Sequence, residues 1–170
     1  DGRQIASGMK EEGKLWDAET CQELSILKGH SDIVEDCEYS PDGKYVVSAS
    51  RDHTVRLWNS EPVEETIDFQ QHDGNINCCD FSPDGKRLLS AGASNARSDV
   101  LVLWDIASRK IITTYKDFMW AGKCVFSPDG KHLAVACNTQ DGNAYLVRDG
   151  KKGETYDRID NSITKPEYSA

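Results

Sequence analysis

The sequence predicts an all-β protein built from four repeats, each holding four short antiparallel strands in about 40–45 residues. The first observation is a repeated turn: "EYSPDGK" at 38–44 recurs as "DFSPDGK" at 80–86 and as "VFSPDGK" at 125–131. The second is that short apolar segments rich in β-branched and aromatic residues flank each copy. No stretch has helical spacing of apolar residues long enough to compete with this interpretation.

The repeated turn defines the register of the repeats. Its serines, Ser40, Ser82 and Ser127, are 42 and 45 residues apart. In Ser-Pro-Asp-Gly the proline presets φ, the aspartate can bond its own backbone, and the glycine accepts a positive φ. We therefore expect a tight hairpin turn between the first and second strands of each repeat.

The strands follow from this register in chain order. First strands lie upstream of the turn, at 32–39, 75–81 and 121–126. Second strands lie downstream, at 45–50, 87–93 and 132–137. Third strands end in Leu-Trp, at 54–59 and 99–105, with a further one at 13–17. Fourth strands lead to the next repeat, at 21–27, 64–70 and 110–115. The pattern is typical of consecutive antiparallel hairpins.

The composition narrows the classes of partner. With 170 residues, 38% hydrophobic and 29% charged, the chain has the make-up of one soluble globular domain. The formal net charge of −9 disfavours nucleic acid and anionic membranes as partners, because both demand clustered Lys and Arg. No apolar run reaches membrane-spanning length, and no signal peptide opens the sequence. We expect neither a nucleic-acid partner nor a membrane.

The six cysteines predict packing rather than disulfide bonds. They form no CxxC pair, and Cys37, Cys79 and Cys124 share one position of the repeat, as small apolar residues would. This usage favours a reducing setting, so we expect a cytoplasmic protein.

Gly-His before the first strand and Trp-Asp at the end of the third make the chain resemble the WD40 β-propeller family. The matching residues are "KGHSDIV" at 28–34, "SPDGKYVVSASRDHTVRLWN" at 40–59, and Leu-Trp-Asp at 15–17 and 103–105. The resemblance covers essentially the whole chain. It implies a propeller with four blades of four antiparallel strands per chain.

The fourth repeat is expected in cyclically permuted form. Counting 42 residues on from Ser127 reaches Ser169, so that "SITKPEYSA" at 162–170 reads as a first strand. Ala170 then takes the place of the turn proline, and Asp1 and Gly2 take the places of the next two residues of the turn. On this reading 1–28 forms strands two to four of a blade that 162–170 completes. The blades 29–70, 71–116 and 117–160 follow.

Three arrangements would close such a chain. We favour a homodimer in which two chains exchange their C-terminal strands and close an eight-bladed ring, which leaves no sheet edge open. A closed four-bladed monomer and a fragment completed by blades from elsewhere remain open. In this register the sequence begins and ends within one turn, which suggests truncation or engineering. The repeats, however, differ too much from one another for a consensus design.

The resemblance also implies a structural hydrogen-bonded set within a blade, formed here by His30, Ser48, Asp52 and Trp58. The next repeat offers His72, Ser90 and Trp104, with Asp99 displaced by a longer loop. Ser, His and Asp together could also form a hydrolase triad. We favour the structural interpretation, because no nucleophile elbow accompanies them and they match structural positions of the family.

Catalysis and cofactors have no support in the sequence. His53 and His132 are isolated from any second metal ligand at suitable spacing, and neither GxGxxG nor a P-loop occurs. We therefore expect no enzymatic activity, no metal and no cofactor.

What remains is recognition of a protein or peptide by surface loops on a rigid scaffold. The residue before each first strand's apolar start is Ile33, Asn75, Trp120 or Ser162, and Trp120 is the most suggestive because Trp is favoured at interface hot spots. Arg51 and Arg97 could add polar contacts on the same face, although a solvated turn is the competing interpretation for both. The alternative function is a self-assembling half-propeller with no ligand of its own.

Overall fold

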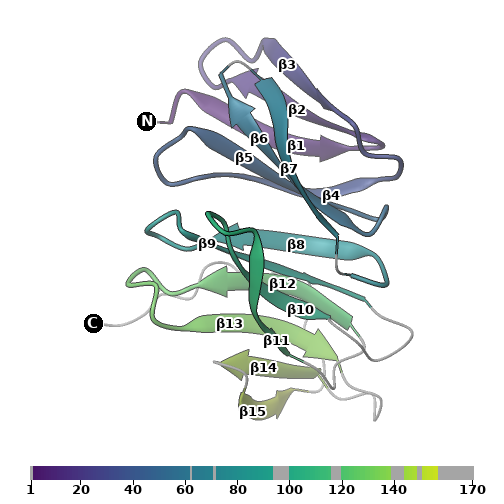
Figure 1. Cartoon of the computed structure of the whole chain (residues 1–170), viewed down its shortest axis with the longest axis vertical. Helices are drawn as coiled ribbons and strands as arrows, with labels where there is room; N and C mark the ends of the chain where they lie inside the picture. The colour runs from purple at the N-terminus through teal and green to yellow at the C-terminus, as the bar shows by residue number, and fades with distance from the viewer. Residues whose placement is uncertain are drawn as a thin grey trace.

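A computed structural model describes residues 2–61, 63–70, 72–93, 100–115, 120–138, 144–148 and 151–156 of the chain. These residues form four antiparallel β-sheets, which confirms the all-β prediction. Figure 1 shows the sheets stacked in chain order, with the first sheet at one end and the last at the other. Among the described residues there is no helix long and apolar enough to cross a membrane.

The strands of the first two sheets are β1 (Gln4–Met9), β2 (Glu12–Asp17), β3 (Glu23–Lys28), β4 (Val34–Tyr39), β5 (Tyr45–Ser50), β6 (Thr54–Ser60) and β7 (Val63–Gln70). The strands of the last two are β8 (Ile76–Phe81), β9 (Arg87–Gly92), β10 (Leu101–Asp105), β11 (Lys110–Tyr115), β12 (Trp120–Phe126), β13 (Leu133–Asn138), β14 (Ala144–Arg148) and β15 (Lys151–Tyr156).

Each sheet is a meander in which sequential strands pair. The second, third and fourth sheets run β4-β5-β6-β7, β8-β9-β10-β11 and β12-β13-β14-β15. The first contains β1-β2-β3. The segment 162–170, expected to supply its remaining strand, lies outside the described residues. The permuted domain boundaries therefore stay a prediction.

The Ser-Pro-Asp-Gly turns form as the sequence predicts, and the serine organises each of them. In the first, the Ser40 hydroxyl donates to Asp42 Oδ1 at 2.7 Å and accepts from the backbone N–H of Tyr45 at 3.0 Å. The turns at Ser82 and Ser127 repeat both bonds. The turn glycines adopt φ values of 67–73°, a left-handed conformation that favours glycine.

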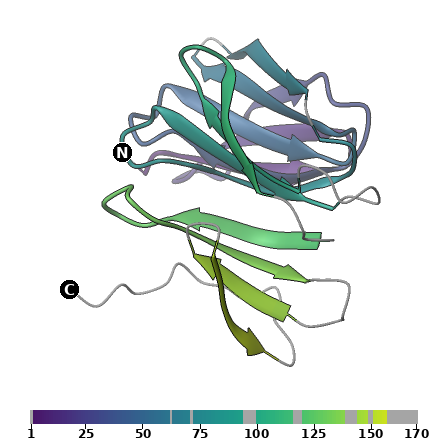
Figure 2. The ribbon, with the colours of Figure 1, turned by 60° about the horizontal axis from the view of Figure 1, so that its bottom comes forward.

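The core lies between the sheets. Buried apolar side chains of the third and fourth sheets pack together, among them Leu89, Val100 and Phe126. A second cluster joins the second and third sheets, and a smaller one around Trp58 and Leu15 joins the first and second. Figure 2 shows the fourth sheet, β12 to β15, stacked against the rest from another side. Each sheet therefore buries its apolar face against a neighbour.

First strands of successive sheets lie next to one another and are joined by carboxylates. Asp36 Oδ2 on β4 accepts from the backbone N–H of Cys79 on β8 at 3.1 Å. Asp80 Oδ2 on β8 accepts from the backbone N–H of Phe126 on β12 at 2.6 Å. Burial raises the pKa of Asp36 above its ordinary value, although the bond from Cys79 works in the opposite direction.

The cysteines occupy the positions that the repeat predicts. Cys79 and Cys124 are buried between first strands, and all six cysteines are free thiols. Burial raises the pKa of Cys37 to about 12, so this thiol stays protonated near neutral pH.

The stacking of successive turns leads to a first prediction, which compares Gly130→Ala with Gly43→Ala. Both changes force alanine into a left-handed φ and should each cost about 1 kcal/mol. A Cβ on Gly130 would also lie 3.2 Å from Arg87 Nη2 and 3.4 Å from Pro83 Cδ, whereas nothing lies within 4 Å at Gly43. We expect Gly130→Ala to lower the urea midpoint of unfolding more than Gly43→Ala. An equal decrease of the urea midpoint in the two variants would contradict the stacking of successive turns.

Candidate functional site

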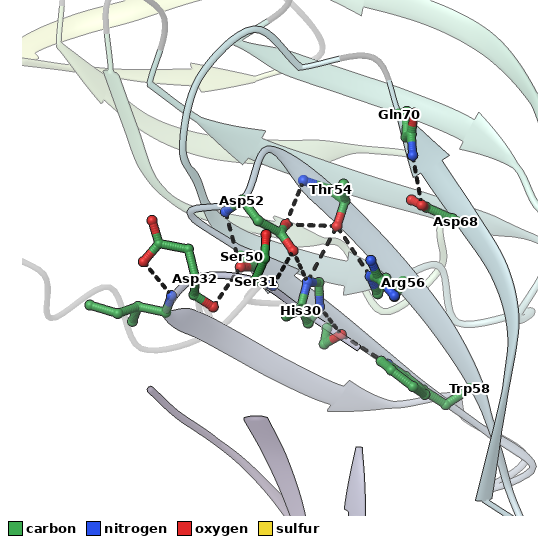
Figure 3. Close-up of polar contacts among 12 residues, drawn as sticks. His30, Ser31, Asp32, Ser50, Asp52, Thr54, Arg56, Trp58, Asp68 and Gln70 are labelled. Carbon is green, nitrogen blue, oxygen red and sulfur yellow. Dashed lines mark hydrogen bonds and ion pairs between the residues drawn. The ribbon is translucent and has the colours of Figure 1, made fainter. Parts of the chain in front are cut away.

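The second sheet contains a chain of hydrogen bonds that joins two of its strands, β5 and β6, to the loop before β4. His30 Nδ1 lies 2.7 Å from Asp52 Oδ2, and His30 Nε2 lies 2.7 Å from Ser48 Oγ. Trp58 Nε1 donates to the same Ser48 oxygen at 2.9 Å. The structure thus brings together the four residues that the sequence analysis grouped, and Figure 3 shows their contacts.

The direction of each bond follows from the chemistry of the groups. The Asp52 carboxylate can only accept, so His30 Nδ1 carries a proton and donates to it. In a neutral imidazole, Nε2 is then an acceptor. Ser48 then donates to Nε2 and accepts from Trp58. A neutral imidazole therefore satisfies every bond of the chain.

Asp52 is held in its ionised form by several donors. Burial of the carboxylate raises its pKa. Hydrogen bonds from Thr54, His30 and the backbone N–H of Ser31 together lower the pKa by a larger amount. The net result is a pKa of about 2, compared with an ordinary 3.8. Thr54 donates to Oδ1 through both its backbone N–H and its hydroxyl, at 2.9 and 2.7 Å.

The order Ser-His-Asp matches the connectivity of a hydrolase triad, but the surroundings rule out that chemistry. The Ser48 side chain is fully buried, and its oxygen already accepts from the Trp58 indole. A nucleophile must face a reacting carbonyl at about 3 Å, and no substrate could reach this oxygen in the folded sheet. The four residues therefore fasten β5, β6 and the loop before β4 together.

Parts of the same arrangement recur in neighbouring sheets. In the third sheet, His72 Nε2 lies 2.7 Å from Ser90 Oγ, and Trp104 Nε1 donates to that oxygen at 2.9 Å. In the first, Trp16 Nε1 donates to Ser7 Oγ at 2.9 Å. Asp99, expected to complete the set of the third sheet, lies outside the described residues.

The candidate binding residues occupy equivalent places, at the start of the first strand, in three successive sheets. Ile33 and Asn75 precede β4 and β8, and Trp120 opens β12. The carbonyl of Ile33 accepts from Arg51 N at 2.9 Å, and that of Asn75 accepts from Ala93 N at 2.8 Å. These bonds hold the backbone at Ile33 and Asn75, and Trp120 lies within β12. The three side chains therefore project from a fixed framework.

Trp120 and Ile33 provide the apolar surface of this face. The Ile33 side chain is 38% exposed. Trp120 is half-buried, and its ring lies over Gly122, where a Cβ would come within 2.1 Å of the indole. Trp120 also forms a β-bridge with Ala93, which follows β9 of the preceding sheet.

Arg51 is engaged in an ion pair on the same face. Its Nε donates to Glu35 Oε1, and both side chains are partly exposed. Arg97 and Ser162, the other two predicted contact residues, lie outside the described residues. The part of the chain that the structure describes contains no group of three His, Cys, Asp or Glu side chains that could hold a metal ion.

The sequence analysis missed a β-bulge at one position of each first strand. The register shifts between Val34 and Asp36, between Ile76 and Cys78, and between Ala121 and Lys123. The extra residues are Glu35, Asn77 and Gly122. A bulge re-aims side chains, which explains why Glu35 reaches Arg51 and why Asn77 Nδ2 reaches Ala121 O, at 2.9 Å. The sequence held one signal for this bulge: Gly122 occupies a position of the repeat that is polar in the other two first strands.

Comparison with known proteins identifies two family models that match the chain. The model described as "WD domain, G-beta repeat" matches residues 21–59. The model described as "Eukaryotic translation initiation factor eIF2A" matches residues 50–141, more than half of the chain. A zebrafish protein, "WD repeat and SOCS box-containing protein 1", is 52% identical over 44 residues. That segment is 25% of this chain and spans only 10% of the zebrafish protein.

The buried network leads to a second prediction, on Asp52→Asn. A folded pKa of about 2 against 3.8 means that ionised Asp52 stabilises the fold by about 2 kcal/mol above pH 3.8. This contribution disappears as the pH falls from 3.8 to 2. We expect urea unfolding at pH 7 to show a loss of about 1–3 kcal/mol in Asp52→Asn, and the difference from wild type to shrink toward pH 2.

The matched control is Asp32→Asn, because Asp32 is exposed and its carboxylate accepts from the adjacent backbone N–H of Ile33. It should change the free energy of unfolding by less than about 0.5 kcal/mol. An Asp52→Asn deficit that is the same at pH 7 and pH 2.5 would refute the assignment of the stabilisation to the ionised carboxylate.

Proposed function

Because this chain belongs to the WD40-repeat family, and over residues 50–141 to the family described as eukaryotic translation initiation factor eIF2A, we propose that it is a non-catalytic scaffold for protein contacts. It would bind a protein or peptide through the face that carries Ile33, Asn75 and Trp120. We call this the loop-bearing face, since the loop before β4 and the loop after β5 meet there, where Arg51 N donates to Ile33 O.

The observation that carries the proposal is the common placement of these three residues. Three successive sheets each present one of them from the same register position, so an apolar residue, a polar residue and an indole occupy equivalent places. A partner that covers the partly exposed Ile33 would bury apolar surface, and tryptophan is favoured at interface hot spots.

Rigidity supports the same role. The loop before β4 is fastened by the His30–Asp52 bond, and the backbone of Ile33 is held by Arg51 N. A partner that binds here would order few protein groups, so little conformational entropy would oppose association. The buried hydrogen-bonded set thus serves binding indirectly, by fixing the loop that presents Ile33.

The chemistry of the face favours a peptide segment with an apolar anchor. Ile33 and Trp120 offer the apolar contact, and the Arg51–Glu35 ion pair provides a polar rim of both charge signs. Apolar centre and polar rim are the usual anatomy of a protein interface. Because the thiols are unpaired, we propose a reducing compartment such as the cytoplasm as the place of action.

A third prediction tests this face with Ile33→Asp. Peptides selected from a random displayed library on the 170-residue chain should lose at least about tenfold in affinity for the variant, because a charge would replace the apolar contact. Isothermal titration calorimetry measures the change in Kd.

Ile112→Asp is the matched control, since Ile112 is 50% exposed on β11, the outer strand of the third sheet. This variant should bind the selected peptides as wild type does. Peptides that lose affinity for Ile112→Asp and keep it for Ile33→Asp would place the binding surface elsewhere and overturn the proposal.

A further inference from the structure

The third and fourth sheets bring two buried thiols into contact. Cys78 on β8 and Cys124 on β12 are 46 residues apart in the chain, and their Sγ atoms lie 3.0 Å apart. The two strands are neighbours in the stack (Figure 1), and both side chains belong to the apolar cluster between these sheets. A disulfide bond is about 2.05 Å long, so the two sulfurs would need to approach each other by only about 1 Å.

The repeat explains why these two thiols meet. Counted back from the turn serines, Asp36 and Cys78 share one position of the first strand, and the following position holds Cys79 or Cys124. Between the second and third sheets, Asp36 reaches across to the backbone N–H of Cys79. Between the third and fourth sheets, Cys78 takes the place of that carboxylate and meets the thiol of Cys124. The docking of the sheets therefore sets a thiol against a thiol where the preceding interface uses a carboxylate.

We propose that Cys78 and Cys124 are a site of reversible oxidation, at which hydrogen peroxide forms a disulfide bond between the third and fourth sheets. One thiol reduces the peroxide and becomes a sulfenic acid, with release of one molecule of water. The other sulfur attacks the sulfenic sulfur as a thiolate, forms the S–S bond and expels the oxygen as a second molecule of water. The pair gives up two electrons and two protons, which the peroxide takes up. A small dithiol reverses the reaction by thiol–disulfide exchange.

Burial sets the conditions under which the pair reacts. The thiolate is the reactive form of cysteine, and burial raises the pKa of Cys124 well above its ordinary value. The pair therefore stays reduced while the two sheets are docked, and peroxide reaches it through transient opening of the interface between β8 and β12. Oxidation should be slower than that of an exposed thiol, and it should accelerate under conditions that favour opening.

The bond would tie together two sheets that otherwise depend on packing and hydrogen bonds for their docking. Because it joins residues 46 positions apart, it restricts the unfolded chain and so favours the state in which the sheets are docked. Both cysteines lie in the interior of their strands, so the link would act on the core of the interface.

The proposal is independent of the function proposed for the loop-bearing face. Formation of the bond is measured by mass and by the number of thiols, whether or not a peptide binds. Loss of peptide binding and failure to form the disulfide are therefore separate results.

Mass spectrometry of the peroxide-treated 170-residue chain is the first test, in a background with Cys21→Ser because Cys21 is exposed. Thiols are alkylated after denaturation. We expect a monomer that has lost two hydrogen atoms and two alkylation sites, with peptides containing Cys78 and Cys124 linked until dithiothreitol is added. The treatment is repeated in urea below the unfolding midpoint, where opening is more frequent and the linked peptide should form faster. Absence of this linked peptide under both conditions overturns the proposal.

Cys78→Ala and Cys79→Ala form a matched pair of variants in the same background. Both side chains are buried and adjacent on β8, but Cys79 packs in the cluster between the second and third sheets. Peroxide should still remove two thiols in Cys79→Ala and should leave every thiol available for alkylation in Cys78→Ala. Loss of two thiols in Cys78→Ala, or in neither variant, would contradict the assignment of the pair.

Urea unfolding tests whether the bond fits the docked sheets. The oxidised protein should have a higher urea midpoint than the reduced protein, and dithiothreitol should abolish the difference. Peroxide should leave the midpoint of Cys78→Ala unchanged, which controls for oxidation at other side chains. An oxidised protein whose midpoint is equal to or below that of the reduced protein would show that the bond distorts the interface, and would refute the proposal.

Discussion

The first strand of each sheet presents backbone N–H groups on the side away from its own ladder, and the rest of the structure depends on how these are satisfied. Alternate residues of an edge strand cannot donate within their own sheet. Here carboxylates of the preceding sheet accept from them, Asp36 from Cys79 and Asp80 from Phe126. An unpaired buried N–H would cost about 1–3 kcal/mol, so each sheet depends on its neighbour for polar as well as apolar contacts.

The positions of the other features follow from this dependence of each sheet on its neighbour. Docked first strands bring Ile33, Asn75 and Trp120 to one face, and the buried bonds of His30 hold the loop that carries Ile33. The arrangement of the loop-bearing face is thus a consequence of one repeat that must stack.

The sequence predicts what is local and repeated. The Ser-Pro-Asp-Gly turns and the strands around them recur along the chain, so their pattern is visible without coordinates. The contacts of Ser48 with His30 and Trp58 were expected from the resemblance to the family, and the structure contains them. The bulge residue Asn77 and the carboxylate Asp80 were not predicted. Their partners, Ala121 and Phe126, lie 44 and 46 residues away on another sheet. Contacts of this kind depend on how the sheets dock, and the repeat does not encode that docking in any short motif.

Amide hydrogen exchange at Cys79 and Phe126 tests the docking of the sheets most directly. The ladder amide of Ser82, which donates to Arg87 O at 3.0 Å, provides the internal reference. If carboxylates of the preceding sheet hold the two outward amides, both should exchange as slowly as Ser82 near neutral pH. Exchange of both at the rate of exposed amides, with Ser82 still protected, would contradict this: the sheets would form without the docking on which the loop-bearing face depends.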